Sequence, residues 1–219
     1  MFAHTPVAVR TIDNLTGPAG RLEALLNTGS PEAKQAVLLC HPHPLGGGTM
    51  HNKVVYHAMK AIQSFGLPVL RFNFRGTGLS EGAHDHGRGE QDDVRAALDW
   101  LDHNLRLPIL FAGFSFGSYV GLRVACSDAR VKAAVALGLP VHAEGRDYSY
   151  EFLARCAIPK LFISGTRDQF GPRDQVEAAV AVAHTPKELV WIDDADHFFA
   201  GKLEEVQAAI RNWYQAHFA

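Results

Sequence analysis

The stretch of the chain best suited to chemistry is Gly113-Phe114-Ser115-Phe116-Gly117, where a serine has a glycine two residues to either side. An apolar run precedes it and a helix-compatible segment follows it, which predicts a strand, a sharp turn and a helix. A serine at such a turn has a strained backbone that exposes its hydroxyl, and the close approach of strand and helix favours glycine on both sides. This G-x-S-x-G pattern is typical of a nucleophile elbow; the alternative is a plain turn with a helix-capping serine.

A serine hydroxyl is a weak nucleophile at neutral pH and needs a base within hydrogen-bonding distance. Asp168 and His197 follow Ser115 in the chain, in the order serine, acid, histidine. Histidine titrates near neutral pH, and a carboxylate can hold its tautomer and stabilise its charged form. We therefore predict a catalytic triad of Ser115, Asp168 and His197, with a turn role as the alternative for Asp168.

Other carboxylates are less suitable partners for His197. Asp193, Asp194 and Asp196 are its neighbours in the sequence, and we expect them to be solvated or to cap a helix. The other candidates, which are less well placed along the chain, are Asp147 and Asp174.

The elements that must position these residues alternate between strands and helices. We expect an antiparallel hairpin over 7–12 and 21–25, followed by buried apolar runs that alternate with amphipathic helical segments. This alternation predicts an α/β fold in one domain over 1–219: a mostly parallel sheet of about eight strands with helices on both faces. In such sheets, functional residues gather at the carboxyl ends of the strands. The later strands are expected at 35–40, 68–74, 110–114, 131–137, 159–164 and 188–192, and the helices at 52–65, 91–105, 118–125, 172–184 and 202–216.

Composition and charge narrow the classes of protein and of partner. The 219 residues are 47% hydrophobic, carry a formal net charge of −2 and contain no basic block suited to nucleic acid. No apolar run is long enough to span a bilayer, and residues 1–10 lack the features of a signal peptide. Three cysteines at irregular spacing indicate reduced, mostly buried thiols. We expect a cytoplasmic monomer or homodimer that binds neither nucleic acid nor a membrane.

Two histidine pairs, His41/His43 and His84/His86, raise the alternative of a metal site. The chain has no CxxC motif, and the prolines around His43 restrict the geometry of the first pair. We therefore expect no metal, and we expect the second pair to be exposed loop residues.

Five segments, taken in order along the chain, resemble the corresponding segments of α/β hydrolases. The resemblance covers nearly the whole chain and is to small, cap-less bacterial serine hydrolases of the dienelactone-hydrolase-like group. It implies the α/β-hydrolase fold and its triad. True dienelactone hydrolases have a cysteine nucleophile, and Ser115 departs from that pattern. The segments are HPHP at 41–44, RFNFRGTGLSEG at 71–82, GFSFGS at 113–118, GTRD at 165–168 and ADHFF at 195–199.

An acyl-transfer intermediate carries an oxyanion that needs backbone N–H donors. Phe116, directly after the nucleophile, is expected to supply one of them. The loop after 35–40 is expected to supply the other, and because its prolines lack an N–H, His43 and Leu45 remain as candidates. The His-Gly-x pattern of the family favours His43.

Only residues 138–158 separate two expected strands at the point where many α/β hydrolases insert a lid. This length is enough for a turn and a short helix over 148–155, so we expect an open site without a helical lid. An open site encloses little of a long acyl chain, which favours short-chain esters.

The same connection is expected to form one wall of the site. Leu139 and His142, with Pro140 and Val141 between them, are the expected wall residues, and Leu45 is expected to contact the substrate from the oxyanion loop.

Arg75 allows two roles, because its guanidinium can bind a substrate carboxylate or tie loops together by hydrogen bonds. We favour the structural role.

These features together predict a serine esterase that forms an acyl-enzyme intermediate on a small-molecule ester and needs no cofactor. A thioesterase or peptidase would use the same chemistry on another substrate. The alternative from a different class is a protein that binds a ligand and keeps only a vestigial triad.

Overall fold

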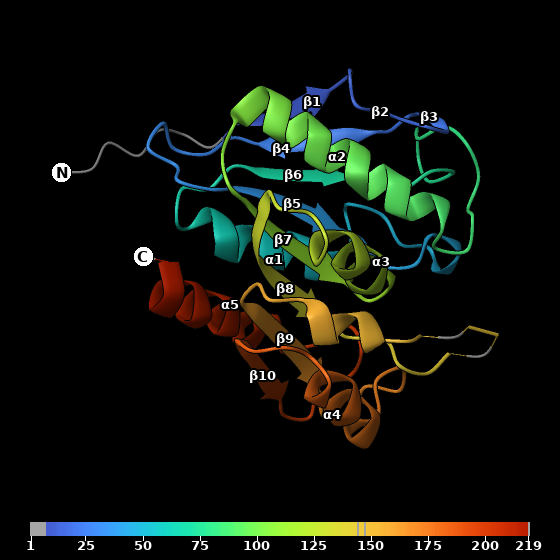
Figure 1. Ribbon diagram of the computed structural model, residues 1–219, viewed down its shortest axis with the longest axis vertical. Helices are drawn as coiled ribbons and strands as arrows, with labels where there is room; N and C mark the ends of the chain where they lie inside the picture. The colour runs from blue at the N-terminus through green and yellow to red at the C-terminus, as the bar shows by residue number, and fades with distance from the viewer. Residues whose placement is uncertain (1–7, 144, 147, 219) are drawn as a thin grey trace.

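A computed structural model describes residues 8–143, 145–146 and 148–218 of the chain. Eight strands form one sheet in the order β1-β4-β6-β5-β7-β8-β9-β10 (Figure 1). The β1–β4 and β4–β6 pairs are antiparallel and the remaining neighbours are parallel, which confirms the predicted sheet. The strands are β1 (Val9–Ile12), β4 (Ala24–Asn27), β5 (Ala36–Cys40), β6 (Val69–Phe72), β7 (Ile109–Phe114), β8 (Val131–Leu137), β9 (Lys160–Gly165) and β10 (Lys187–Ile192).

The N-terminal hairpin differs in detail from the expectation. The partner of β1 is β4, which begins three residues later than the expected strand at 21–25. Two short strands, β2 (Thr16–Gly17) and β3 (Gly20–Arg21), form a separate two-stranded sheet between them. Residue 7, the first of the expected hairpin, lies outside the described residues.

Five α-helices in the described part of the chain cover the two faces of the sheet (Figure 1). The buried side chains of α1 and α5 share one core with the sheet, and those of α2, α3 and α4 share the other. Each helix turns one apolar stripe to the sheet, because its apolar residues recur every three or four positions. None of the described helices has the length and apolar character needed to cross a bilayer. The helices are α1 (Lys53–Gln63), α2 (Gly89–Leu105), α3 (Phe116–Ala125), α4 (Arg173–Ala181) and α5 (Leu203–Phe218).

Within its described residues, the connection between β8 and β9 contains a single short helix, the 3-10 helix η2 (Glu151–Arg155). An isolated bridge between Ala143 and Arg146 makes a narrow hairpin earlier in the same connection. The described residues of this connection form no helical lid, as its length predicts.

Strand register brings the loops of the expected site to one edge of the sheet. Cys40 at the end of β5 pairs with Gly113 near the end of β7, and Gly165 at the end of β9 pairs with Ile192 at the end of β10. Because these strands are parallel, the segments that follow them leave the sheet side by side.

His41 ties the segments after β5 and β6 together. Its imidazole is fully buried, and its Nε2 accepts a hydrogen bond from the Phe74 N–H at 3.0 Å. Its Nδ1 lies 2.6 Å from the Pro42 carbonyl oxygen, which only accepts, so Nδ1 carries the proton of a neutral ring. Burial lowers the pKa of His41 from 6.5 to about 4, although the bond to Pro42 opposes this effect. From the sequence we considered a metal for His41, expected none and assigned it no other role; the structure gives it a structural one.

Arg75 has the favoured structural role. Its Nη2 donates to Asp93 Oδ1 at 2.7 Å, its backbone N–H donates to Asp93 Oδ2 at 3.0 Å, and both residues are buried. A side chain at Gly89 would collide with this guanidinium, since an added Cβ would lie 2.0 Å from Arg75 Nη1. The ion pair therefore joins the loop after β6 to the first turns of α2.

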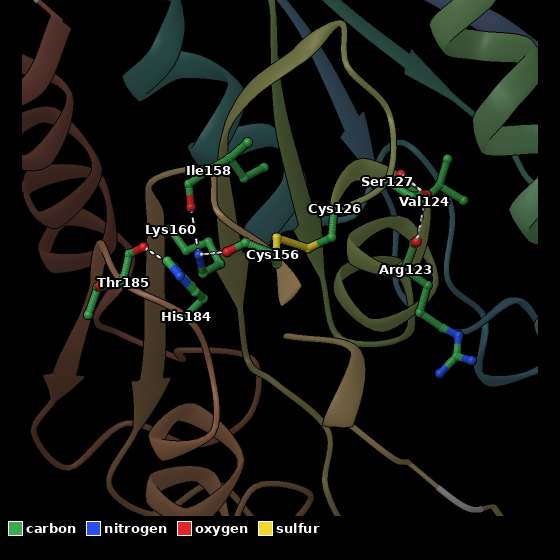
Figure 2. Close-up of a disulfide and its surroundings, with 9 residues drawn as sticks. All are labelled: Arg123, Val124, Cys126, Ser127, Cys156, Ile158, Lys160, His184 and Thr185. Atoms are coloured by element: carbon green, nitrogen blue, oxygen red, sulfur yellow. Dashed lines mark hydrogen bonds between the residues drawn. A yellow bond between two sulfur atoms is a disulfide. The ribbon is translucent and has the colours of Figure 1, made fainter. Parts of the chain in front are cut away.

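Cys126 and Cys156 form a disulfide, so the expectation of three reduced thiols is wrong for these two residues (Figure 2). The bond joins the end of α3 to the residue after η2, with a Cα–Cα distance of 4.8 Å across 30 residues of sequence. Beside it, the buried Lys160 amine donates to the Cys156 carbonyl (Figure 2). Only folding brings the two cysteines together, and their spacing matches no motif. Cys40 is free and buried.

We predict that reducing this disulfide lowers the free energy of unfolding by about 3.5 kcal/mol, because a closed loop of this length restricts the unfolded chain. Urea denaturation with and without dithiothreitol measures the change. In the double variant Cys126→Ala/Cys156→Ala, the reductant should have no further effect. A thiol titration of the denatured, unreduced protein should find one thiol, and three thiols would contradict the disulfide.

We also predict that the protein loses stability as the pH falls from 6.5 to 4. The unfolded chain protonates His41 near 6.5 and the folded protein only near 4, so this residue stabilises the folded state above pH 6.5. Its contribution, about 3 kcal/mol, disappears across that window. His41→Gln keeps an acceptor for the Phe74 N–H but does not titrate, so its unfolding free energy should depend less on pH. The control is His51→Gln at an exposed site, and an equal effect in both variants would refute the assignment.

Candidate active site

Ser115 lies between the end of β7 and the start of α3, with φ 54° and ψ −122°. An L-residue rarely adopts a positive φ of this kind, and such strain is typical of functional turns. The Ser115 N–H donates to the Leu137 carbonyl of β8 at 2.9 Å, which holds the turn against the sheet. The elbow geometry agrees with the G-x-S-x-G pattern.

Gly113 and Gly117 allow the backbones on either side of this turn to meet. A Cβ at Gly117 would lie 2.4 Å from the His41 carbonyl oxygen, and a Cβ at Gly113 would lie 2.7 Å from the Gly117 carbonyl oxygen. Both neighbours are backbone atoms, which have little freedom to move aside. Glycine is therefore needed at both positions for packing.

Ser115, His197 and Asp168 form a continuous hydrogen-bonded chain. His197 Nδ1 lies 2.8 Å from Asp168 Oδ2, and His197 Nε2 lies 2.8 Å from Ser115 Oγ. A carboxylate only accepts, so Nδ1 carries the proton, and the bare Nε2 accepts from the serine hydroxyl. Ser115 is 8% exposed, His197 2% and Asp168 5%, so little water competes for these hydrogen bonds.

The Asp168 carboxylate is held on both oxygens. While Oδ2 faces His197, Oδ1 accepts the N–H groups of Phe170 at 2.8 Å and Gly171 at 3.0 Å. These backbone bonds fix the orientation of the carboxylate.

The carboxylates beside His197 in the chain have partners other than the histidine. Asp193 Oδ1 accepts from the Thr166 hydroxyl, and Asp194 pairs with Arg167 at 2.9 Å. Asp196 Oδ1 accepts the N–H groups of Phe198 and Ala200 in the next turn, so it caps a turn and not the helix expected from the sequence.

Three phenylalanine rings surround the His197 imidazole. Their centroids lie 4.8 Å (Phe170), 5.1 Å (Phe114) and 5.3 Å (Phe198) from that of the histidine. At Gly165, an added Cβ would lie 2.3 Å from the Ala195 carbonyl oxygen, so the histidine loop packs directly on the end of β9. This packing leaves the ring little freedom to turn away from the serine.

The loop after β5 is stiff and presents one free candidate donor. The His43 carbonyl accepts the N–H groups of Gly46 and Gly48, each at 3.0 Å. The Leu45 N–H donates to His43 Nδ1 at 3.1 Å and is therefore engaged. Of the two candidate donors named from the sequence, only the His43 N–H has no acceptor among the described residues. The Phe116 N–H opens α3, where the first N–H groups have no partner within the helix.

Ser115 lines a cavity of about 380 Å³. Ser115 is only 8% exposed, whereas three apolar side chains that line the same cavity are much more exposed: Leu45 (73%), Phe198 (48%) and Phe170 (36%). Pro140 from the β8–β9 connection also lines it. The site has no lid, but the serine is recessed below these side chains and does not lie on an open surface.

Two of the expected wall residues lie elsewhere. Leu139 is fully buried in the core, and His142 is exposed and does not line the cavity. Val141 likewise does not line the cavity. The reason is the hairpin closed by Ala143 and Arg146, which brings residues further along the chain to the site.

His84 and His86 line a second, smaller cavity of about 240 Å³. The expectation of two exposed residues is correct for His86 and wrong for His84, whose side chain is 9% exposed. His84 Nδ1 lies 2.8 Å from the buried Glu90 carboxylate, at an angle outside hydrogen-bond geometry. Nowhere in residues 8–143, 145–146 and 148–218 do three histidine, cysteine or acidic side chains gather as metal ligands would.

Sequence reasoning missed three residues that line the two cavities, two from the β8–β9 connection and one from α3. Arg146 and Tyr148 line both cavities, and Tyr119 lines the second. Tyr119 lies four residues after Ser115, one turn further along α3. This spacing was the one feature of the sequence that could have predicted its place near the serine. Arg146 carried no signal, because its position depends on how an irregular segment turns back.

Comparison with known proteins gives matches over nearly the whole chain. A family model described as an alpha/beta hydrolase domain matches residues 33–217. An uncharacterized protein of Rickettsia prowazekii is 39% identical over 205 aligned residues, and the match covers 90% of this chain and 85% of that protein.

Two solved structures are similar in both sequence and fold. An alpha-beta serine hydrolase homologue from Coxiella burnetii has 38% identity and a TM-score of 0.82, over 94% of this chain and 96% of the other. A serine hydrolase without lid from Xanthomonas campestris has 33% identity and a TM-score of 0.83, over 97% and 95%. These matches support the predicted cap-less hydrolase and do not single out the dienelactone-hydrolase-like group. The chain belongs to the alpha/beta hydrolase family.

Proposed function

We propose that this protein is a serine esterase that cleaves short-chain carboxylic esters through an acyl-enzyme intermediate. The observation that carries the proposal is the buried hydrogen-bonded chain from Asp168 through His197 to Ser115, with 2.8 Å at each link. The membership of the chain in the alpha/beta hydrolase family supports hydrolysis as the reaction class.

In the proposed reaction, His197 Nε2 takes the Ser115 proton as Oγ attacks the ester carbonyl. The Asp168 carboxylate then stabilises the imidazolium that forms. His197 returns the proton to the leaving alcohol. It next activates a water molecule, which attacks the acyl-enzyme and releases the acid.

The oxyanion of each tetrahedral intermediate would be held by the backbone N–H groups of Phe116 and His43. The two hydrogen bonds to the His43 carbonyl support this role, because they fix the loop before substrate arrives. Donors that need no rearrangement stabilise the developing charge at little cost.

The cavity supports a preference for small acyl groups. Its volume of about 380 Å³ is near the lower end for binding sites of small molecules, and its rim side chains are partly exposed to solvent. A long acyl chain would extend past Leu45 and Phe198 into water and gain little buried area.

A cytoplasmic location stays a prediction. It rested in part on three reduced cysteines, and the Cys126–Cys156 disulfide removes that support. We keep the monomer and the homodimer as alternative oligomeric states.

We predict that Ser115→Ala lowers kcat/KM for p-nitrophenyl acetate and butyrate at least about 1,000-fold, because the nucleophile is lost. The control is Ser127→Ala, which removes an exposed hydroxyl at the other end of α3 and should keep full activity. Across acyl chain lengths, kcat/KM of the unaltered protein should fall beyond butyrate. Activity that survives Ser115→Ala would refute the mechanism.

We predict that Asp168→Asn lowers kcat by about 1,000- to 10,000-fold, since an amide can donate to Nδ1 and so favours the wrong histidine tautomer. Asp194→Asn provides the matched control, because asparagine tolerates the positive φ of 57° found there. Equal losses in both variants would show that Asp168 has no special role.

A fluorophosphonate probe separates the esterase from a protein that only binds a ligand. We expect the probe to label Ser115 of the unaltered protein, and the absence of labelling would favour the binding protein. If labelling occurs without p-nitrophenyl ester turnover, thioesters and amides are the substrates to test next.

A further inference from the structure

The second cavity lies directly beside the one that holds Ser115. The two cavities share His43, Arg146 and Tyr148 as lining residues, so these side chains form the boundary between them. An arm of a substrate bound at the serine would therefore meet these side chains. The bridge between Ala143 and Arg146 lies in the connection between β8 and η2.

The described side chains that line the two cavities include a permanent positive charge and no carboxylate. Among the described residues that line either cavity, Arg146 carries the one permanent charge, and none is an aspartate or glutamate. Arg146 is exposed and has no carboxylate partner within the described part of the chain. Arg75, in contrast, is neutralised by Asp93.

His43 supplies a neutral hydrogen-bond donor at the same boundary. Burial lowers its pKa to about 4, and the nearby charge of Arg146 contributes, so the ring is neutral at pH 7. Because Nδ1 accepts the Leu45 N–H, the ring proton is on Nε2. That nitrogen has no hydrogen-bond partner among the described residues and is not fully buried, so it is accessible as a donor.

Aromatic rings complete the second cavity. Tyr119 and Tyr148 pack edge to face, with ring centroids 4.8 Å apart, and Phe116 lies 4.6 Å from the His43 ring. These faces can cover the apolar part of a small ligand while the polar edge is left to Arg146 and His43.

We propose that the second cavity binds an anionic group, a carboxylate or a phosphate, on one arm of the ester substrate, with Arg146 as its charge partner and His43 Nε2 as a donor. The substrates would then be acidic esters, such as half-esters of short dicarboxylic acids. This inference rests on the proposed esterase function of the neighbouring serine. Arginine suits the role because its planar fork matches the geometry of both anions.

Binding to the Ser115→Ala variant tests the cavity without relying on turnover. Isothermal titration calorimetry would compare monomethyl glutarate with its neutral counterpart, methyl valerate. We expect the half-ester to bind about tenfold more tightly, and Arg146→Gln in the same background to remove that preference. Arg155→Gln, which removes an exposed charge from the same connection outside both cavities, should leave it intact.

Equal affinity for the two ligands would overturn the proposal, as would an equal loss in the Arg146→Gln and Arg155→Gln variants. Competition then identifies the anion: displacement of the half-ester by glutarate indicates a carboxylate, and displacement by inorganic phosphate indicates a phosphate. Displacement by neither also overturns the proposal.

Kinetics with the active protein give an independent measurement. The ratio of kcat/KM for the p-nitrophenyl half-ester of glutarate to that for p-nitrophenyl valerate should fall about tenfold in Arg146→Gln, after subtraction of spontaneous hydrolysis. An unchanged ratio would contradict the anion site. In Ser115→Ala, turnover of both esters should be lost while the tighter binding of the half-ester remains. The esterase proposal and the anion-site proposal can therefore fail separately.

Discussion

The arrangement of the site depends on how closely helix α3 approaches strands β5 and β7. An added Cβ at Gly117 would lie 2.4 Å from the His41 carbonyl oxygen, and one at Gly113 would lie 2.7 Å from the Gly117 carbonyl oxygen. This contact forces the chain through the left-handed region at Ser115 and brings the start of α3 against the loop after β5. The hydroxyl and the N–H groups of Phe116 and His43 thus derive their positions from one backbone contact. The neutral, buried His41 stabilises the same loop from its other side.

Much of the fold was predictable because its signals are local. Continuous apolar runs identified the buried parallel strands, and helical spacing identified the helices, since both patterns reflect burial against a sheet. The order Ser115, Asp168, His197 was also readable, because parallel strands bring the loops at their carboxyl ends together whatever lies between them. The position of β4 was less accurate, since turn residues on both sides of it left several registers possible.

The walls of the site were not predictable from the same reasoning. Leu139 was expected at the substrate and is buried, while Arg146, seven residues later, lines both cavities. Periodicity carries information only within helices and strands, and the β8–β9 connection is irregular over most of its length. The disulfide escaped prediction for a similar reason: Cys126 and Cys156 are 30 residues apart, and only the folded path of the chain brings them within 4.8 Å.

The disulfide also defines which part of this protein can vary independently of the rest. At one end, the β8–β9 connection continues from a strand in the middle of the sheet, and at the other it is covalently bound to the last turn of α3. One end is therefore anchored to the strand beside β7 and the other to the end of α3, while the hairpin between them belongs to neither. The length and side chains of this segment can change in evolution or by engineering while its two attachment points stay in place. Related hydrolases with this bond could thus diverge in substrate choice without any change in the geometry around the serine.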